Sequence, residues 1–162
     1  MSSRIAVVLP GRWRILASNL LHWLSGDHVH PVVEFHLSSA EPLVFAEEVR
    51  FATTDGKHRV VRSRDVWSGD SFVARETGFL RPGSRRWSLG GASDDGNIVV
   101  VRHRFGRPAL RQSAMGTLSG IDVMVRDGAD TGEVRALVAG DVEAFRLSVE
   151  EFASLAWLPE TR

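Results

Sequence analysis

The chain has 162 residues, with 20 basic and 20 acidic side chains, a formal net charge of zero and no cysteine. This length fits one domain, residues 1–162, and is enough to bury a sizeable core. The charge balance argues against a nucleic-acid partner, and the lack of cysteine excludes disulfides, thiol catalysis and cysteine-ligated metals. No apolar run reaches the roughly 18 residues that span a membrane, so we expect no membrane partner, and the composition fits a cytoplasmic protein.

The N-terminal segment predicts the start of a barrel. Residues 4–9 form a short apolar run that fits a strand or an entry segment, and Pro10-Gly11 marks a turn. Residues 12–17 follow as a strand that carries Trp13. A tryptophan at this point, just before a run of short strands, is expected to close one end of a barrel.

A short helical turn is expected next, over Leu20–Leu24, with Ser18 or Asn19 as its cap. Such a segment is too short to be stable alone, and its bulky apolar side chains must cover something. A lid across the mouth of a barrel would satisfy this requirement. A connector packed on the outside of the sheet would satisfy it equally well, and both interpretations stay open.

From residue 31 the pattern changes to the period of two that is typical of strands. Turn signals follow at Asp55-Gly56, Ser68-Gly69-Asp70, Pro82-Gly83-Ser84 and Asp94-Asp95-Gly96-Asn97. The strands beyond the first turn are predicted at about residues 58–67, 71–81, 86–89, 98–104, 121–126 and 133–138. Short strands separated by frequent turns indicate an all-β fold, which we interpret as a single antiparallel up-and-down β-barrel of about 8–10 strands.

The C-terminal end of the chain predicts a helix. Ser148-Val149-Glu150-Glu151 is a capping box, in which the serine hydroxyl and the Glu151 carboxylate serve each other's backbone amides. Phe152, Leu155 and Ala156 provide an apolar stripe, and Pro159 stops the helix. The barrel is therefore expected to carry a short N-terminal lid helix and a short C-terminal helix on its outside.

Several segments resemble the calycin superfamily, and more closely lipocalin-like and nitrobindin-like bacterial proteins of uncharacterised function. They are Gly11-Arg12-Trp13, Trp23-Leu24-Ser25-Gly26, Phe72-Val73-x-Arg75-x-x-Gly78-x-Leu80 and Gly120-Ile121-Asp122-Val123. The resemblance covers roughly residues 10–126 and implies a β-barrel with an internal pocket. The lipocalin Thr-Asp-Tyr motif is missing, and the chain contains no tyrosine.

The resemblance does not extend to a cofactor. Nitrobindin-like proteins hold haem through a histidine late in the chain, whereas the last histidine here is His103, so no cofactor is expected. His28-Val29-His30, flanked by His22 and His36, could offer imidazoles to zinc or copper. No acidic residue completes that set, and we expect solvated loop histidines and no metal.

Glu47 is the strongest candidate for a catalytic or ligand-binding role. It shares a strand face with Leu43, Phe45, Val49 and Phe51, so on the inside of a barrel its carboxylate needs a partner. Arg75, on the strand that follows residue 71, is a candidate partner, and Asp65, which alternates with Val61 and Trp67, is a second candidate for an inward carboxylate. Glu47, Asp65 and Arg75 are therefore the candidate catalytic residues. The alternatives are a purely structural ion pair, or a strand register shifted by one residue, which exchanges the two faces.

Two functions fit these features. The first is binding of a small apolar or amphipathic ligand inside the barrel. The second is a small barrel enzyme of metabolite or natural-product biosynthesis, such as an isomerase, cyclase or decarboxylase, that uses an inward acid–base residue. A partner-binding module with a filled core is a third possibility, and a homodimer is conceivable. The residues expected to contact a ligand are Trp23, His36, Phe45, Glu47, Trp67, Arg75 and Trp87.

Overall fold

The computed structural model describes residues 2–77, 84–106 and 118–159, which form nine strands and four helices. The strands are β1 (Gly11–Ser18), β2 (His28–Ala40), β3 (Leu43–Thr53), β4 (His58–Trp67), β5 (Phe72–Glu76), β6 (Ser84–Ala92), β7 (Ile98–Phe105), β8 (Leu118–Arg126) and β9 (Ala156–Trp157). The helices are α1 (Ser2–Val8), α2 (Leu21–Leu24), α3 (Val134–Gly140) and α4 (Val149–Ala153).

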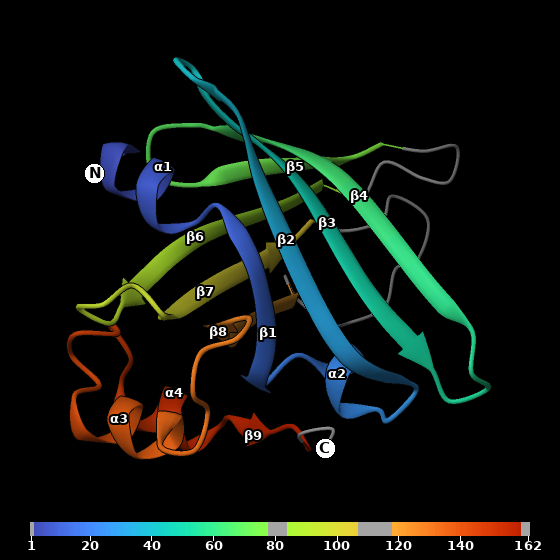
Figure 1. Cartoon of the computed structure of the whole chain (residues 1–162), viewed down its shortest axis with the longest axis vertical. Helices are drawn as coiled ribbons and strands as arrows, with labels where there is room; N and C mark the ends of the chain where they lie inside the picture. The colour runs from blue at the N-terminus through green and yellow to red at the C-terminus, as the bar shows by residue number, and fades with distance from the viewer. Residues whose placement is uncertain (1, 78–83, 107–117, 160–162) are drawn as a thin grey trace.

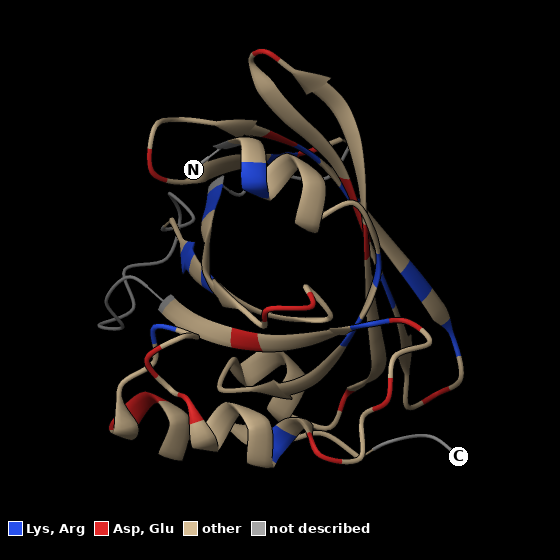
Figure 2. Ribbon diagram, turned by 60° about the vertical axis from the view of Figure 1, so that its left-hand side comes forward, with Lys and Arg blue, Asp and Glu red and all other residues tan. Residues whose placement is uncertain are grey.

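The strands β1 to β8 close into an antiparallel up-and-down barrel (Figures 1 and 2). Each strand pairs with the next along the chain, and β1 closes the ring by pairing with both β8 and β2. The short β9 pairs with the end of β1, outside the ring. The predicted all-β barrel with short terminal helices is therefore confirmed.

Two short segments differ from the sequence-based expectation. Residues 4–9 lie largely in helix α1 rather than in a strand, and residues 134–138 of the strand expected at 133–138 lie in helix α3. In both places short apolar runs fit either structure, and tertiary packing decides. The helical spacing of four residues buries Ile5 with Leu9 and Val134 with Val138 on one side of each segment.

The lid helix α2 also begins differently from the expectation. Its N-cap position is Leu20, which provides no side-chain hydrogen bond. The Ser18 hydroxyl accepts a hydrogen bond from the backbone N–H of Leu20. The Asn19 side chain accepts one from the backbone N–H of Ile121 at 2.7 Å and donates one to the Ser154 hydroxyl at 3.0 Å. The expected cap residues therefore tie the segment to β8 and the C-terminal region instead of capping the helix.

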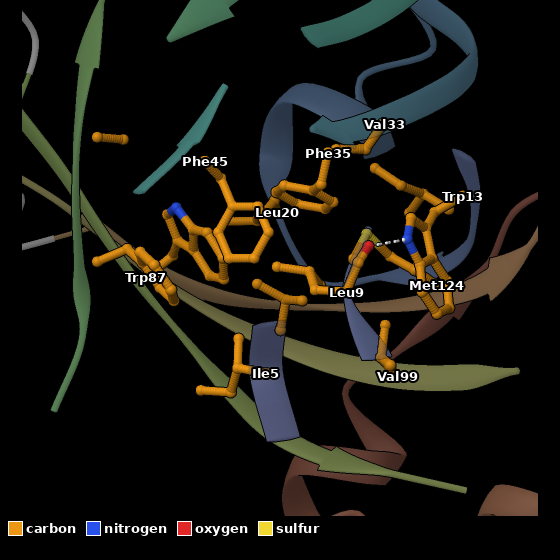
Figure 3. Packing of buried hydrophobic residues seen from close by; sticks show 14 of the residues in the cluster. Ile5, Leu9, Trp13, Leu20, Val33, Phe35, Phe45, Trp87, Val99 and Met124 are labelled. Atoms are coloured by element: carbon orange, nitrogen blue, oxygen red, sulfur yellow. Dashed lines mark hydrogen bonds between the residues drawn. The ribbon is translucent and has the colours of Figure 1, made fainter. Parts of the chain in front are cut away.

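Trp13 closes one end of the barrel, as the sequence predicts (Figure 3). Its indole N–H donates to the carbonyl of Leu9 at 2.8 Å, so the end of α1 and the start of β1 are joined inside the core. The guanidinium of Arg126 lies 4.4 Å from the centre of the Trp13 ring and donates to the carbonyls of Val8 and Pro10. This end of the molecule is therefore filled by side chains.

The buried residues form two clusters. The inner cluster fills the closed half of the barrel around the rings of Trp13, Phe35, Phe45, Phe72 and Trp87. The outer cluster lies between the outer faces of β1, β7 and β8 and the C-terminal segment. That segment includes α4, whose capping box of Ser148 and Glu151 is present as predicted. In the described part of the chain, none of the helices is long and apolar enough to cross a membrane.

Candidate functional site

A cavity of about 180 Å³ lies inside the barrel at the end opposite Trp13. This end gathers the helix α2, the β3–β4 turn and the start of β6, because the strands alternate in direction. The upper wall is apolar and includes Leu20, Trp23, Val49, Phe51, Val61 and Phe105. Deeper in the barrel, polar side chains join apolar ones such as Phe35, Val101 and Met124. The polar members of this layer are called the polar floor below, and they are Glu47, Ser63, Arg85, His103 and Asp122.

The centre of the polar floor is an ion pair that crosses the barrel from β6 to β3. Arg85 donates to the Glu47 carboxylate, and both side chains are largely buried. The Ser63 hydroxyl lies 2.8 Å from Glu47 Oε2 and 2.6 Å from Asp65 Oδ1. Asp65 also accepts the indole N–H of Trp87 at 2.7 Å. Every carboxylate of this group therefore has a partner.

The contacts of Ser63 require an additional proton. A hydroxyl has one proton to donate, yet Ser63 Oγ lies within hydrogen-bond distance of two carboxyl groups. Both bonds form together only when one carboxyl is protonated. Burial, and then the charge of Glu47, raise the pKa of Asp65 from 3.8 to about 6, against the opposing effect of Arg85. We therefore assign the extra proton to Asp65 under mildly acidic conditions.

A second polar pair, His103 on β7 and Asp122 on β8, continues the floor. Arg85 Nη1 lies 3.4 Å from His103 Nδ1, and a guanidinium only donates, so Nδ1 accepts and the imidazole proton lies on Nε2. His103 Nε2 lies 3.0 Å from Asp122 Oδ2 but out of line for a hydrogen bond. Asp122 Oδ1 has no hydrogen-bond partner among the residues that the structure describes.

The helix α2 covers the cavity from above. Trp23 points inward and contacts Phe51, with ring centres 5.7 Å apart, while Leu21 is exposed. His22 lies beside Phe105, and burial lowers its pKa despite the nearby carboxylate of Asp122. The lid that the sequence predicts is therefore present, with Trp23 as its inner face.

Trp23 also borders a second hollow, of about 390 Å³, on the outside of the barrel. This hollow lies where β1 and β2 separate, because their pairing ends at Arg14 and Val32. Trp23 and Ile15 line both spaces. The lid tryptophan therefore stands between the interior and a lateral groove.

The predicted site residues that face inward have different surroundings. Glu47 lines the cavity, whereas Asp65 is fully buried in the layer beneath it. Phe45 and Trp87 belong to the packed inner cluster, where the Trp87 and Phe72 rings stack at 4.2 Å. Trp67 packs on the edge of the same cluster. These three aromatic residues support the floor from below and do not line the cavity.

Two predicted site residues point the other way. Arg75 is exposed on the outer face of β5, and the partner of Glu47 is Arg85. The inward neighbour of Arg75 is Ala74, which pairs with Asp65 across the sheet. His36 is also exposed, on the outer face of β2, where it lies 3.2 Å from Glu34. Both expectations for these residues are wrong, because each lies one position away from the inward face.

The residues that sequence reasoning missed are Arg85, His103 and Asp122. Little along their own strands singles these residues out: Arg85 lies next to Arg86, and His103 lies between two arginines. Each gains its role from a neighbour on another strand. Within the described ranges, no group of three or more histidine, aspartate and glutamate side chains is arranged to hold a metal. His28, which the sequence pairs with His30 as a possible ligand set, bonds through Nδ1 to the carbonyl of His22.

Solved structures share this fold at low sequence identity. Lobster apocrustacyanin A1 aligns over 99% of this chain and 86% of its own, with a TM-score of 0.64 and 7% identity. The bovine lipocalin allergen Bos d 2 aligns over 94% and 93%, with a TM-score of 0.59 and 10% identity. A bovine odorant-binding protein aligns over 95% and 99%, with a TM-score of 0.54 and 12% identity. No protein-family model and no curated protein matches the sequence.

Proposed function

We propose that this chain, which has the lipocalin fold, binds a small molecule with an apolar body in the barrel cavity under α2. The observation that carries the proposal is the cavity of about 180 Å³ between an apolar upper wall and a polar floor. Small-molecule sites are concave and mostly apolar, with a few polar groups that fix the orientation of the ligand. The odorant-binding protein of similar fold carries such a function in its name.

The size of the cavity limits the ligand. A dry cavity of about 150 Å³ in another protein holds one benzene molecule, and this one is only slightly larger. The packed cluster around Trp87 fills the barrel below the polar floor, so a longer chain could not extend in that direction. We therefore expect a molecule built on one ring, or a short aliphatic chain of similar volume.

Calorimetric titration with 2-phenylethanol, a single-ring probe, tests the proposal. The wild-type protein is expected to bind it with a 1:1 stoichiometry. Val49→Trp places a bulky ring in the cavity and should abolish binding, because Val49 lines its upper wall. Ala46→Trp adds the same ring to the exposed face of the same strand and should leave binding unchanged. Equal binding to both variants would contradict an interior site.

A small barrel enzyme is the second candidate. Two observations favour it: Glu47 lines the cavity, and the pKa of Asp65 is raised. Binding is the better supported function, because Arg85 and Ser63 already occupy the Glu47 carboxylate and Asp65 has no access to the cavity. Turnover of any identified ligand that disappears in Glu47→Gln would support the enzyme. Retained turnover would rule out Glu47 as its acid or base.

A further inference from the structure

Three buried residues that line the cavity carry polar atoms without a hydrogen-bond partner. In the described part of the chain these atoms are Trp23 Nε1, His103 Nε2 and Asp122 Oδ1, and His103 Nε2 lies 3.0 Å from the other oxygen of Asp122. Trp23, His103 and Asp122 are only 7%, 6% and 3% exposed, respectively. An unpartnered buried polar atom costs free energy, so their common location indicates a ligand that supplies the missing partner.

The charges around the cavity determine which sign of charge the ligand should carry. Glu47, Glu76 and Asp122 line it with carboxylates, and Arg85 is the one basic side chain among its described lining residues apart from two histidines. His103 Nδ1 faces the Arg85 guanidinium, and His103 Nε2 faces Asp122 Oδ2. Arg85 is already paired with Glu47. The cavity therefore carries an excess of negative charge, and Asp122 Oδ1 is a buried acceptor in it that has no partner among the described residues.

We propose that the ligand is a small cationic amine with an apolar body, whose ammonium group binds the free oxygen of Asp122. This inference rests on the proposed function and names the class of ligand. A buried carboxylate oxygen without a hydrogen-bond donor is unfavourable, and an ammonium group supplies both a donor and a positive charge. An anionic ligand would meet Glu47 and Asp122 and be repelled.

The aromatic side chains of the upper wall fit the same class. Trp23, Phe51 and Phe105 surround the apolar part of the cavity. Their ring faces attract a nearby cation and pack against a ligand ring. The indole N–H of Trp23 adds a donor at the lid, where an oxygen atom elsewhere on the ligand could accept it. That contact adds a requirement for an acceptor atom on the ligand and does not alter the charge that the ligand is expected to carry.

Three probes of nearly equal size test the proposal by calorimetry at neutral pH: 2-phenylethylamine, 2-phenylethanol and phenylacetate. The amine is expected to bind at least about tenfold more tightly than the alcohol, as a charge-assisted hydrogen bond predicts. Phenylacetate is expected to bind most weakly. An alcohol or acetate that binds as tightly as the amine would overturn the inference, while leaving the proposed function intact.

The variant Asp122→Asn assigns the preference to one residue. It should reduce amine affinity by at least about tenfold and change alcohol affinity by less than about threefold. Retained alcohol binding shows that the cavity is still folded. Asp127→Asn removes the same charge at the closed end, where Asp127 pairs with Arg12, and should leave the amine preference unchanged. A preference that survives in Asp122→Asn would overturn the inference, and failure of all three probes on the wild-type protein would reject the proposed function itself.

Discussion

At the scale of single residues, the floor of the cavity is a set of buried charges that hold one another in place. Burial opposes the charged form of Arg85, yet the carboxylates of Glu47 and Asp65 keep its pKa above the usual range. Removing one partner of such a group leaves a buried charge unpaired, which is more costly than the pair is favourable. Arg85 and Glu47 therefore hold each other in place as charged partners, while the raised pKa of Asp65, about 6, lets this carboxyl change its charge under mildly acidic conditions.

The raised pKa of Asp65 predicts that the chain loses stability as the pH rises. The folded state holds this proton up to about pH 6, whereas the ordinary value is 3.8. The contribution is therefore fully present below pH 4 and is lost through pH 6, with a total of at most about 3 kcal/mol. Asp65→Asn mimics the protonated form at every pH. The difference in the free energy of unfolding between this variant and the wild type should therefore grow in favour of the variant by up to that amount between pH 4 and pH 8. Urea unfolding at each pH measures the difference.

The comparison with Asp65→Asn needs a control, because other groups titrate over the same range. Asp127→Asn, on a half-exposed side chain paired with Arg12, should follow the wild-type profile in parallel. A constant difference between Asp65→Asn and the wild type from pH 4 to pH 8 would contradict the assignment of the proton to Asp65.

Residues of this site differ in how far the sequence alone identifies them. Glu47 and Asp65 follow from strict alternation along β3 and β4, since one well-placed apolar neighbour fixes the face of a whole strand. Arg85 does not, because its pairing with Glu47 joins β6 to β3 and depends on the closure of the barrel. His103 and Asp122 are likewise neighbours only after β7 and β8 pair. The alternation along one strand predicts which face of the sheet a residue occupies. Identifying the residue that it contacts also requires the register between strands.

At the scale of elements, the lid helix is held by its entry segment more than by its own hydrogen bonds. The side chain of Leu20 is buried against Gly120 of β8, and a Cβ atom at Gly120 would lie 2.1 Å from Leu20 Cδ2. Asn19, one residue earlier, bonds to the amide of Ile121. The absence of a side chain at Gly120 is therefore what lets the lid close over the cavity.

Gly120→Ala should loosen the lid. The added methyl group overlaps Leu20 and lies 3.0 Å from Asn19 Oδ1, so the segment must shift, at a cost of about 1–3 kcal/mol. Faster amide hydrogen exchange over residues 20–26 and a red-shifted tryptophan emission would report the change. Gly140→Ala has no atom within 4 Å of the new methyl group and is the matched control. Unchanged exchange at the lid in Gly120→Ala would show that Gly120 does not position it.

The elements that sequence reasoning misassigned are the short ones. Residues 4–9 and 133–138 each offer a few apolar side chains, too few to separate a period of two from one of 3.6. Their structure is set by what they pack against. The Leu9 carbonyl accepts the indole N–H of Trp13, and Val134 and Val138 are part of the outer cluster. The long strands were predictable because their alternation extends over more residues.

At the scale of the whole molecule, the two buried clusters share their strands. On β7, Val99 and Val101 belong to the inner cluster, while Ile98 and Val100 belong to the outer one. The run of four apolar residues arises because this wall of the barrel is covered on both faces, by the interior and by the C-terminal segment (Figure 2). A strand that lost its outer cover would also lose the alignment that holds its inner side chains. We therefore expect the barrel and the C-terminal segment to unfold together.

Gly91→Ala tests this coupling from the outside of the barrel. A Cβ atom at Gly91 would lie 2.3 Å from the Ala144 carbonyl oxygen and 2.5 Å from Phe145 Cα, and backbone atoms cannot move aside as a side-chain end can. The segment around the buried Phe145 must therefore lift from β6, which should lower the free energy of unfolding by about 2–3 kcal/mol. Urea unfolding followed by far-ultraviolet circular dichroism and by tryptophan fluorescence should still show one coincident transition, at a lower midpoint, because β1, β7 and β8 serve both clusters. Two separate transitions would contradict the coupling, and a midpoint equal to that of Gly140→Ala would contradict the close packing at Gly91.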